Sequence, residues 1–181
     1  MSAFRLVPVV ARALLAPPLT TLDGSVLRLR VLPTDLDTNM HMNNGRYLSM
    51  MDLGRFDLVV RSRLHRPLIR LRWKPLVGSA TIRFRRSLRP FQAYDLRTRV
   101  LCWDDKWFVF EQRFDSEGSL YALGLVRALF RGANGNVHPA DALRAGGIEI
   151  DSPPIPDYIS GWAQSDDEAT AAALEQAAPL P

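Results

Sequence analysis

Polar side chains capable of chemistry gather in one short stretch, Asp35 to Asn44, directly before a long apolar segment. The stretch holds the carboxylates of Asp35 and Asp37, the imidazole of His41 and the amides of Asn43 and Asn44. A carboxylate attacks a carbonyl carbon or takes a proton from water, and an imidazole titrates near neutral pH. The first backbone N–H groups of a helix can polarise a carbonyl oxygen or hold an anion. One helix cap needs only one acceptor, so this density of polar groups favours a site.

Each of these residues also has a purely structural interpretation. Asn43 or Asn44 would cap the helix, and the two aspartates would lie near its positive end. We interpret Asp35 as a loop or cap residue. For His41 the two interpretations are balanced: a structural imidazole, or one that holds Asp37 or a substrate carbonyl.

The elements that position this stretch follow from the hydrophobic periodicity. Residues 25–31 alternate polar and apolar side chains, which predicts a strand that ends near Pro33. From Asn44 to about Arg63 the period becomes helical, and apolar residues occupy most of the circumference, which predicts a buried helix. The narrow polar line of this helix includes Asp52, which we interpret as a structural partner of Arg55 or of another arginine.

Four further strands follow a proline-punctuated connector at residues 64–78. Each strand ends at a turn signal, and we predict them at residues 80–88, 94–103, 106–114 and 120–130. Short strands that follow one another in this way predict an antiparallel meander. The predicted fold class is therefore α+β, with an antiparallel sheet of five or more strands wrapped around one long central helix.

The chain divides into three predicted parts. Residues 1–24 form an amphipathic segment, residues 25–150 form the main domain, and residues 151–181 form a proline-rich segment with an acidic helical tail. In that tail Ser165 and Glu168 have the spacing of a capping box, which predicts that a helix begins there. The first segment is too short and too interrupted by prolines to span a bilayer. Weak contact of this segment with a membrane surface is the alternative to packing on the body or on a partner.

The charge of the chain is uneven. The last stretch from Ser165 has four acidic residues and no basic one, which leaves 23 basic and 15 acidic residues before it, a net charge of +8. A single cysteine, Cys102, rules out an intramolecular disulfide and is compatible with a cytoplasmic protein. A basic surface can attract nucleic acid, but we find no helix-turn-helix, glycine-rich loop or aromatic platform, and we expect no nucleic-acid partner.

Several short motifs carry a resemblance to a known family. They are Asp35-Leu36-Asp37, His41-Met42-Asn43-Asn44 with Arg46-Tyr47-Leu48, Trp103-Asp104-Asp105, and the late Pro153, Pro154, Pro156 and Trp162. The chain resembles hotdog-fold thioesterases of the 4-hydroxybenzoyl-CoA thioesterase-like superfamily. Within it, the chain is most similar to the branch of thioesterase superfamily member six and its bacterial relatives. The resemblance extends from Val26 to Trp162.

The resemblance implies an acyl-CoA or acyl-carrier thioesterase that needs neither metal nor cofactor. It implies that Asp37 is the catalytic carboxylate, acting as nucleophile or general base, and that a backbone N–H at Asn44 polarises the thioester carbonyl. His41 is the third catalytic candidate, and Asn43 and Tyr47 are substrate-binding candidates. The leaving thiol has a pKa near 8.5 by analogy with cysteine, so it departs without a strong general acid. The resemblance also implies a homodimer or a dimer of dimers.

An exposed basic face is predicted on the strands between residues 80 and 99. Its arginines are Arg83, Arg85, Arg86, Arg89, Arg97 and Arg99. They form either a solvated face or a contact for the phosphates of coenzyme A, for which Arg83 and Arg85 are the candidates.

The chain departs from the family motif at one position, where Met40 replaces the glycine that precedes the histidine. Because glycine tolerates a positive φ, we expect the loop to turn differently here or the substrate to lie elsewhere. This departure keeps open a hotdog protein that binds acyl thioesters or lipids without hydrolysing them. A hotdog dehydratase is a further alternative, disfavoured by the His41–Asn44 context and by the missing glycine-proline loop.

Overall fold

The computed structural model describes residues 3–19 and 23–176 of the 181-residue chain. Its helices are α1 (Ala3–Leu15), α2 (Asn44–Arg61), α3 (His65–Arg70), α4 (Pro139–Ala145) and α5 (Asp157–Gln176), with a short 3-10 helix at Pro33–Asp35. Its strands are β1 (Ser25–Arg30), β2 (Lys74–Phe84), β3 (Ala93–Trp103), β4 (Phe108–Ser116), β5 (Ser119–Gly132) and β6 (Gly135–Val137). Among the described residues, no helix combines the length and the apolar character that crossing a membrane requires.

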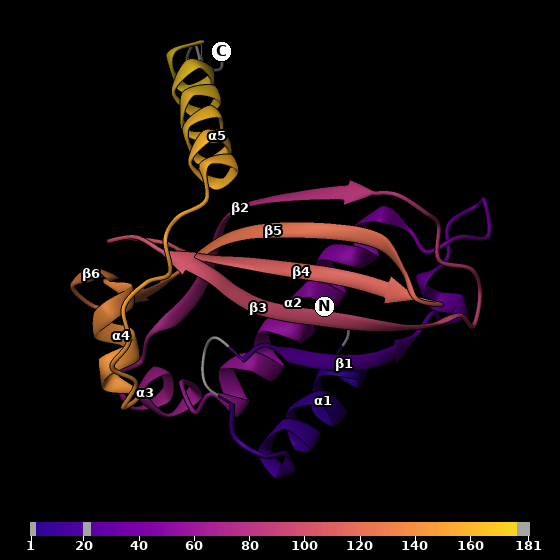
Figure 1. The fold of residues 1–181 in the computed structure, drawn as a ribbon, viewed down its shortest axis with the longest axis horizontal. Helices are drawn as coiled ribbons and strands as arrows, with labels where there is room; N and C mark the ends of the chain where they lie inside the picture. Colours follow the sequence, from indigo (N-terminus) through magenta and orange to yellow (C-terminus); the bar gives the residue numbers. More distant parts are fainter. Residues whose placement is uncertain (1–2, 20–22, 177–181) are drawn as a thin grey trace, which may run out of the picture.

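The strands form one antiparallel sheet that curls around α2 (Figure 1). Their order is β1-β3-β4-β5-β2, with β6 paired to the end of β5. The inner face of the sheet buries aromatic and aliphatic side chains against α2, among them Leu96, Phe110, Phe114 and Val126. This arrangement confirms the predicted α+β fold, a sheet wrapped around one long helix.

Helix α2 approaches the sheet closely because Gly54 has no side chain. A Cβ at this position would lie 2.3 Å from Thr98 Oγ1. Beside this contact, the buried Gln112 side chain donates hydrogen bonds to the Met51 carbonyl (2.9 Å) and to Thr98 Oγ1 (2.9 Å). The helix begins at Asn44, as predicted, and ends at Arg61, close to the predicted Arg63.

The prediction for the strand at residues 80–88 was wrong in its start and in its pairing. Strand β2 begins at Lys74, within the predicted connector, which also contains α3. It pairs with β5 and not with β3, so it lies at the far edge of the sheet and the simple meander is limited to β3-β4-β5. Pro75 misled the prediction because an edge strand tolerates a proline that a central strand would not.

The predicted start of the last helix was also wrong. Helix α5 begins at Asp157, so Ser165 lies inside it and forms no capping box. The first turns of α5 pack on the outer face of the sheet, the face opposite α2, where Ile159 contacts the buried Cys102 and Val109. That tertiary contact, which the local spacing of Ser165 and Glu168 does not reveal, extends the helix toward its N-terminus.

Helix α1 packs along α2 on the side of β1 (Figure 1). Arg5 and Ala13 are buried in this contact, whereas Leu14 and Leu15 are exposed. The interpretation of the first segment as one that packs on the body is therefore confirmed for the described part of that segment.

Candidate functional site

The loop between the 3-10 helix and α2 is built around the Asp37 carboxylate. Its Oδ1 accepts hydrogen bonds from the backbone N–H groups of Asn39 (2.9 Å) and His41 (3.2 Å). The Asp37 N–H donates in turn to the His41 carbonyl (2.8 Å), and the Met40 N–H donates to the Asp37 carbonyl (3.1 Å). Within the described residues, no hydrogen bond or ion pair engages Oδ2 of Asp37. One carboxylate oxygen therefore shapes the loop, and the other is available for chemistry.

Met40 adopts the backbone conformation that a glycine would adopt. Its φ is +58°, and its side chain is 60 % exposed. Of the two alternatives expected here, a loop that turns differently was wrong, because the hydrogen bonds to Asp37 on either side hold Met40 in the left-handed region. A substrate that lies elsewhere stays a prediction. Because the residue is largely exposed, the strain lies in its backbone.

The conformation of Met40 predicts how this position responds to substitution. Met40→Val is expected to lower the free energy of unfolding by about 1–2 kcal/mol, because a β-branched residue is strongly disfavoured at positive φ. Met40→Gly is the matched control and should be close to neutral, since relief of strain offsets the greater freedom of glycine in the unfolded chain. Urea unfolding of both variants measures the difference. Equal stability of the two would contradict a strained Met40.

Asp35 anchors the loop from inside the protein. Its side chain is 2 % exposed and pairs with Arg5 of α1, and Arg46 of α2 approaches it to 3.8 Å. Its Oδ2 also accepts the Leu32 N–H (2.8 Å), and its backbone carbonyl accepts the Asn43 N–H (2.8 Å). Asp35 thus joins α1, the end of β1 and the start of α2, which supports its structural interpretation.

The start of α2 supplies a free backbone donor. Asn43 caps the helix, and its Oδ1 accepts the Gly45 N–H (2.9 Å) while its carbonyl accepts the Arg46 N–H (2.8 Å). The Asn44 N–H has no hydrogen-bond partner among the described residues, and the residue is exposed. An N–H at the positive end of an 18-residue helix is suited to a developing negative charge.

Tyr47 supports the loop from the core. It is 2 % exposed, and its ring packs against Phe84 (5.0 Å between centroids) and Phe114 (4.8 Å). Burial raises the pKa of its phenol, and a hydrogen bond from the backbone of Leu88 counteracts this rise. The Leu88 carbonyl also accepts the Met42 N–H (2.9 Å). The backbone of Leu88 therefore contacts both Tyr47 and the loop.

The two arginines predicted to bind phosphate lie in different places. Arg83 follows the register of β2 and β5 onto the outer face of the sheet, the face of Arg127 and α5. Arg85, Arg86 and Arg89 lie in the segment that follows β2. This segment contains Leu88, whose carbonyl accepts the Met42 N–H of the loop. All of these arginines are exposed. The structure therefore brings together Asp37, the start of α2 and the Arg85 segment, but not Arg83.

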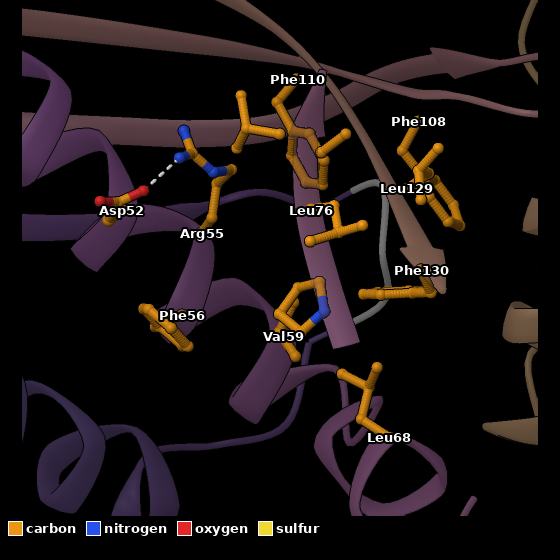
Figure 2. A pocket seen from close by; sticks show the side chains of 13 residues that line it. Asp52, Arg55, Phe56, Val59, Leu68, Leu76, Phe108, Phe110, Leu129 and Phe130 are labelled. Atoms are coloured by element: carbon orange, nitrogen blue, oxygen red, sulfur yellow. Dashed lines mark hydrogen bonds and ion pairs between the residues drawn. The ribbon is translucent and has the colours of Figure 1, made fainter. Parts of the chain in front are cut away.

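A second feature, an apolar cavity of about 150 Å³, lies between α2 and the sheet (Figure 2). Aromatic side chains of β4 and β5 (Phe108, Phe110 and Phe130) and exposed residues of β2 (Leu76 and Val77) form most of its wall. No sequence pattern predicted this cavity. Its only local signal was the phenylalanine at alternate positions of β4.

One end of the cavity is polar. Figure 2 shows the ion pair between Asp52 and Arg55 there, and Arg55 also donates to Gln112 Oε1 (2.6 Å). Burial lowers the pKa of Arg55, and Asp52 counteracts this effect. The predicted structural pair of Asp52 and Arg55 is confirmed. Asp52 is eight residues beyond Asn44, so at about 1.5 Å per residue the cavity begins about 12 Å along α2 from the loop.

Comparisons with known proteins give the chain a family. A sequence profile of a thioesterase-like superfamily matches residues 31–163. Protein THEM6 of Danio rerio is 37 % identical over 150 residues, which cover 81 % of this chain and 72 % of that protein. Protein THEM6 of Xenopus laevis is 50 % identical over 84 residues, which cover 46 % of this chain and 41 % of that protein. The chain therefore spans less than half the length of the Xenopus protein.

Solved structures give the same fold. A gentisyl-coenzyme A thioesterase superposes with a TM-score of 0.59 at 21 % identity, and the match covers 66 % of this chain and 99 % of that one. With the profile match over most of its length and the curled sheet around α2, the chain belongs to the thioesterase-like superfamily of hotdog-fold proteins.

Proposed function

We propose that this protein hydrolyses acyl-CoA thioesters at the loop between the 3-10 helix and α2. The observation that carries the proposal is one loop that contains both a carboxylate oxygen of Asp37 and the Asn44 N–H at the start of α2, neither of which is engaged by another described residue. Membership in a thioesterase-like superfamily supports a thioester as the substrate. A coenzyme A carrier is supported by the structural likeness to a gentisyl-coenzyme A thioesterase.

The chemistry assigns one role to each group. The Asn44 N–H donates to the thioester carbonyl oxygen and stabilises the negative charge that develops there during attack. Asp37 Oδ2 either attacks the carbonyl carbon or removes a proton from the attacking water. The carbon–sulfur bond then breaks and the thiolate leaves, because a thiol is acidic enough to depart without a strong acid. If Asp37 is the nucleophile, water then hydrolyses the acyl-aspartate anhydride, which releases the carboxylic acid and restores the Asp37 carboxylate. His41 and Asn43 line the loop beside these groups, where they would orient the carbonyl.

The apolar cavity would receive the acyl group. An apolar cavity of about this volume accommodates a benzene-sized ligand, which suits an aromatic or a short acyl chain. The cavity lies well along α2 from the Asp37 loop of its own chain. Residues Leu76 and Val77 of the cavity lie near the beginning of β2, however, whereas Phe84 at its end contacts Tyr47 below the loop.

A homodimer would bring the apolar cavity of one chain close to the Asp37 loop of the other. Strand β2 is a sheet edge whose side chains are almost all exposed, including Leu76 (41 %) and Phe84 (42 %). Such an edge is normally covered or paired. Antiparallel pairing of two β2 strands places the beginning of one beside the end of the other, and thus the cavity of one chain beside the loop of its partner. We also propose a cytoplasmic location, because the single, buried thiol of Cys102 needs no oxidising environment.

A panel of acyl-CoAs tests the proposed function. Acetyl-, hexanoyl-, palmitoyl- and benzoyl-CoA are incubated with the full chain, and release of free thiol is followed with a chromogenic disulfide. Turnover of one or more of them supports hydrolysis, with the aromatic and short acyl groups favoured. Binding of an acyl-CoA, seen by calorimetry, without thiol release would assign the fold to a binding protein instead.

The Arg85 segment predicts how binding depends on salt. In the described part of the chain, Arg85, Arg86 and Arg89 form no ion pair, so their guanidinium groups are available to the phosphates of coenzyme A. Because exposed ion pairs weaken as salt rises, KM for an acyl-CoA should increase with ionic strength. The matched control is the same acyl group on pantetheine, which lacks the nucleotide, and its KM should change far less. Equal changes would show that the segment is only a solvated surface.

A further inference from the structure

The apolar cavity has one end that an apolar acyl tail would avoid. A tail enters from the β2 edge, where Leu76 and Val77 are exposed. At the polar end the side chain of Arg55 is 13 % exposed, and its Nε–H has no hydrogen-bond partner among the described residues. A tail packed against this guanidinium would remove its remaining water without supplying an acceptor, which is unfavourable. The polar end therefore directs an apolar tail the other way.

The other end of the cavity is apolar. Val59 of α2 lines it, together with Leu68 of α3 and Phe130 of β5. Val59 is seven residues beyond Asp52 on the same face of α2, which places it about 10 Å farther along the helix axis. Figure 2 shows Val59 and Leu68 below Asp52 and Arg55, away from the ion pair. An apolar tail that extends from the β2 edge therefore runs toward Val59.

A second, smaller void lies behind Val59. Its volume is about 10 Å³, and it shares Val59, Phe108, Phe110 and Phe130 with the cavity. The rest of its wall is formed by Leu58, Ser62, Leu64 and Val100. The Ser62 hydroxyl donates to the Val59 carbonyl (3.4 Å), and the other side chains of this wall are apolar. Because the four shared residues line both spaces, they form the partition between them.

Val59 is the part of this partition that a small change can remove. The three phenylalanines are buried and pack around Phe108, whose ring centroid is 5.7 Å from that of Phe130 and 6.3 Å from that of Phe110. Val59 comes from α2, whose position is fixed by the hydrogen bond from Gln112. A valine in a helix keeps almost entirely to one χ1 rotamer, so its side chain stays between the two spaces.

We propose that Val59 limits the length of the acyl group that this protein accepts. This inference rests on the proposed function and deepens it, because it names the residue that selects the substrate at the same site. A tail that reaches Val59 can lengthen only by displacing side chains from a close-packed interior, which is costly. With a smaller residue at position 59, the cavity and the void would form one longer space.

A series of chain lengths measures this limit. We compare kcat/KM for saturated acyl-CoAs from butanoyl to dodecanoyl in the wild type, Val59→Ala and Val59→Phe. The wild-type values should fall beyond the length at which the tail reaches Val59. Val59→Ala should move the optimum to chains about two carbons longer and raise their kcat/KM relative to the wild-type optimum about tenfold, the scale expected for two buried methylene groups. Val59→Phe should move the optimum to shorter chains.

Val60→Ala is the matched control. It makes the same chemical change one residue away, at a buried position that lines neither the cavity nor the void. Its loss of packing should lower stability in urea, but the order of preference among chain lengths should not change. A general effect of a smaller side chain in α2 would move both alanine variants alike, so the comparison isolates the position of Val59.

Binding separates the length limit from hydrolysis. S-alkyl-CoA thioethers of the same lengths have no thioester to cleave, and their dissociation constants are measured by calorimetry. If these constants shift with Val59→Ala while no acyl-CoA releases thiol, the length limit is supported and the proposed hydrolysis fails. An unchanged profile in Val59→Ala, or an equal shift in Val60→Ala, would overturn the role of Val59 and leave hydrolysis intact. No binding of any thioether and no thiol release would overturn both.

Discussion

Asp37→Asn is expected to lower kcat for the best acyl-CoA at least about a hundredfold, the usual scale for loss of a catalytic acid or base. The amide has the shape of the carboxylate but neither attacks a carbonyl nor removes a proton from water. Its oxygen can still accept the N–H groups of Asn39 and His41, which now bind Asp37 Oδ1. The loop should therefore keep its conformation, and the free energy of unfolding should change by less than about 1 kcal/mol.

Asp37→Ala separates the structural role of this residue from the chemical one. Alanine removes both hydrogen bonds, so it should lower activity as much as asparagine does and should also destabilise the loop by about 1–3 kcal/mol. Steady-state kinetics and urea unfolding of both variants give the four values needed. Wild-type turnover by Asp37→Asn would show that Asp37 only shapes the loop and that another group does the chemistry.

Arg5→Met is expected to produce the largest loss of stability among the ion pairs described. Removal of the guanidinium leaves the Asp35 carboxylate, 2 % exposed, without its main partner. Breaking a buried pair in this way costs about 3–5 kcal/mol, and the Leu32 N–H together with the more distant Arg46 should keep the loss at about 3 kcal/mol. Since Asp35 holds the start of α2 through the Asn43 N–H, activity should fall as well.

An exposed ion pair provides the control. Arg144 and Asp141 are paired at 2.8 Å but are 65 % and 56 % exposed, so Arg144→Met should cost less than about 1 kcal/mol. The double variant Arg5→Met with Asp35→Asn removes the uncompensated charge and should recover part of the loss. If Arg5→Met and Arg144→Met are equally stable in urea, the buried pair does not anchor the loop.

Local sequence patterns predicted correctly those parts of the fold that depend on neighbouring residues. The helical period and the cap at Asn43 placed the start of α2 correctly, and alternation placed β3 within one residue. Residues 74–79 of β2 were missed because an edge strand tolerates Pro75, which in the sequence indicates a connector. Its pairing with β5 depends on where the chain crosses the sheet, which periodicity does not encode.

The candidate site was predictable to a similar extent. The motif identified Asp37 and the helix start, because both lie in one continuous stretch. Arg5 was not predicted as the partner of Asp35, since it is 30 residues away in an arginine-rich chain. The conformation of Met40 was not predicted, because its positive φ comes from the hydrogen bonds to Asp37 around it and not from the preference of methionine. The cavity arises only when α2, β2, β4 and β5 come together.

The buried Gln112 has a consequence for how substrates are selected by length. Its amide links the Met51 carbonyl and Thr98, while its oxygen receives Arg55, so it is bonded to α2 at two points and to the sheet at one. If α2 slid along its axis or rotated, these polar groups would lose their partners in a dry interior, where such losses are costly. The position of the helix start relative to the cavity is thus a fixed dimension of the molecule. In the proposed dimer, where the cavity and the loop come from different chains, the span open to a substrate would therefore depend on how the two chains pair and not on movement of α2.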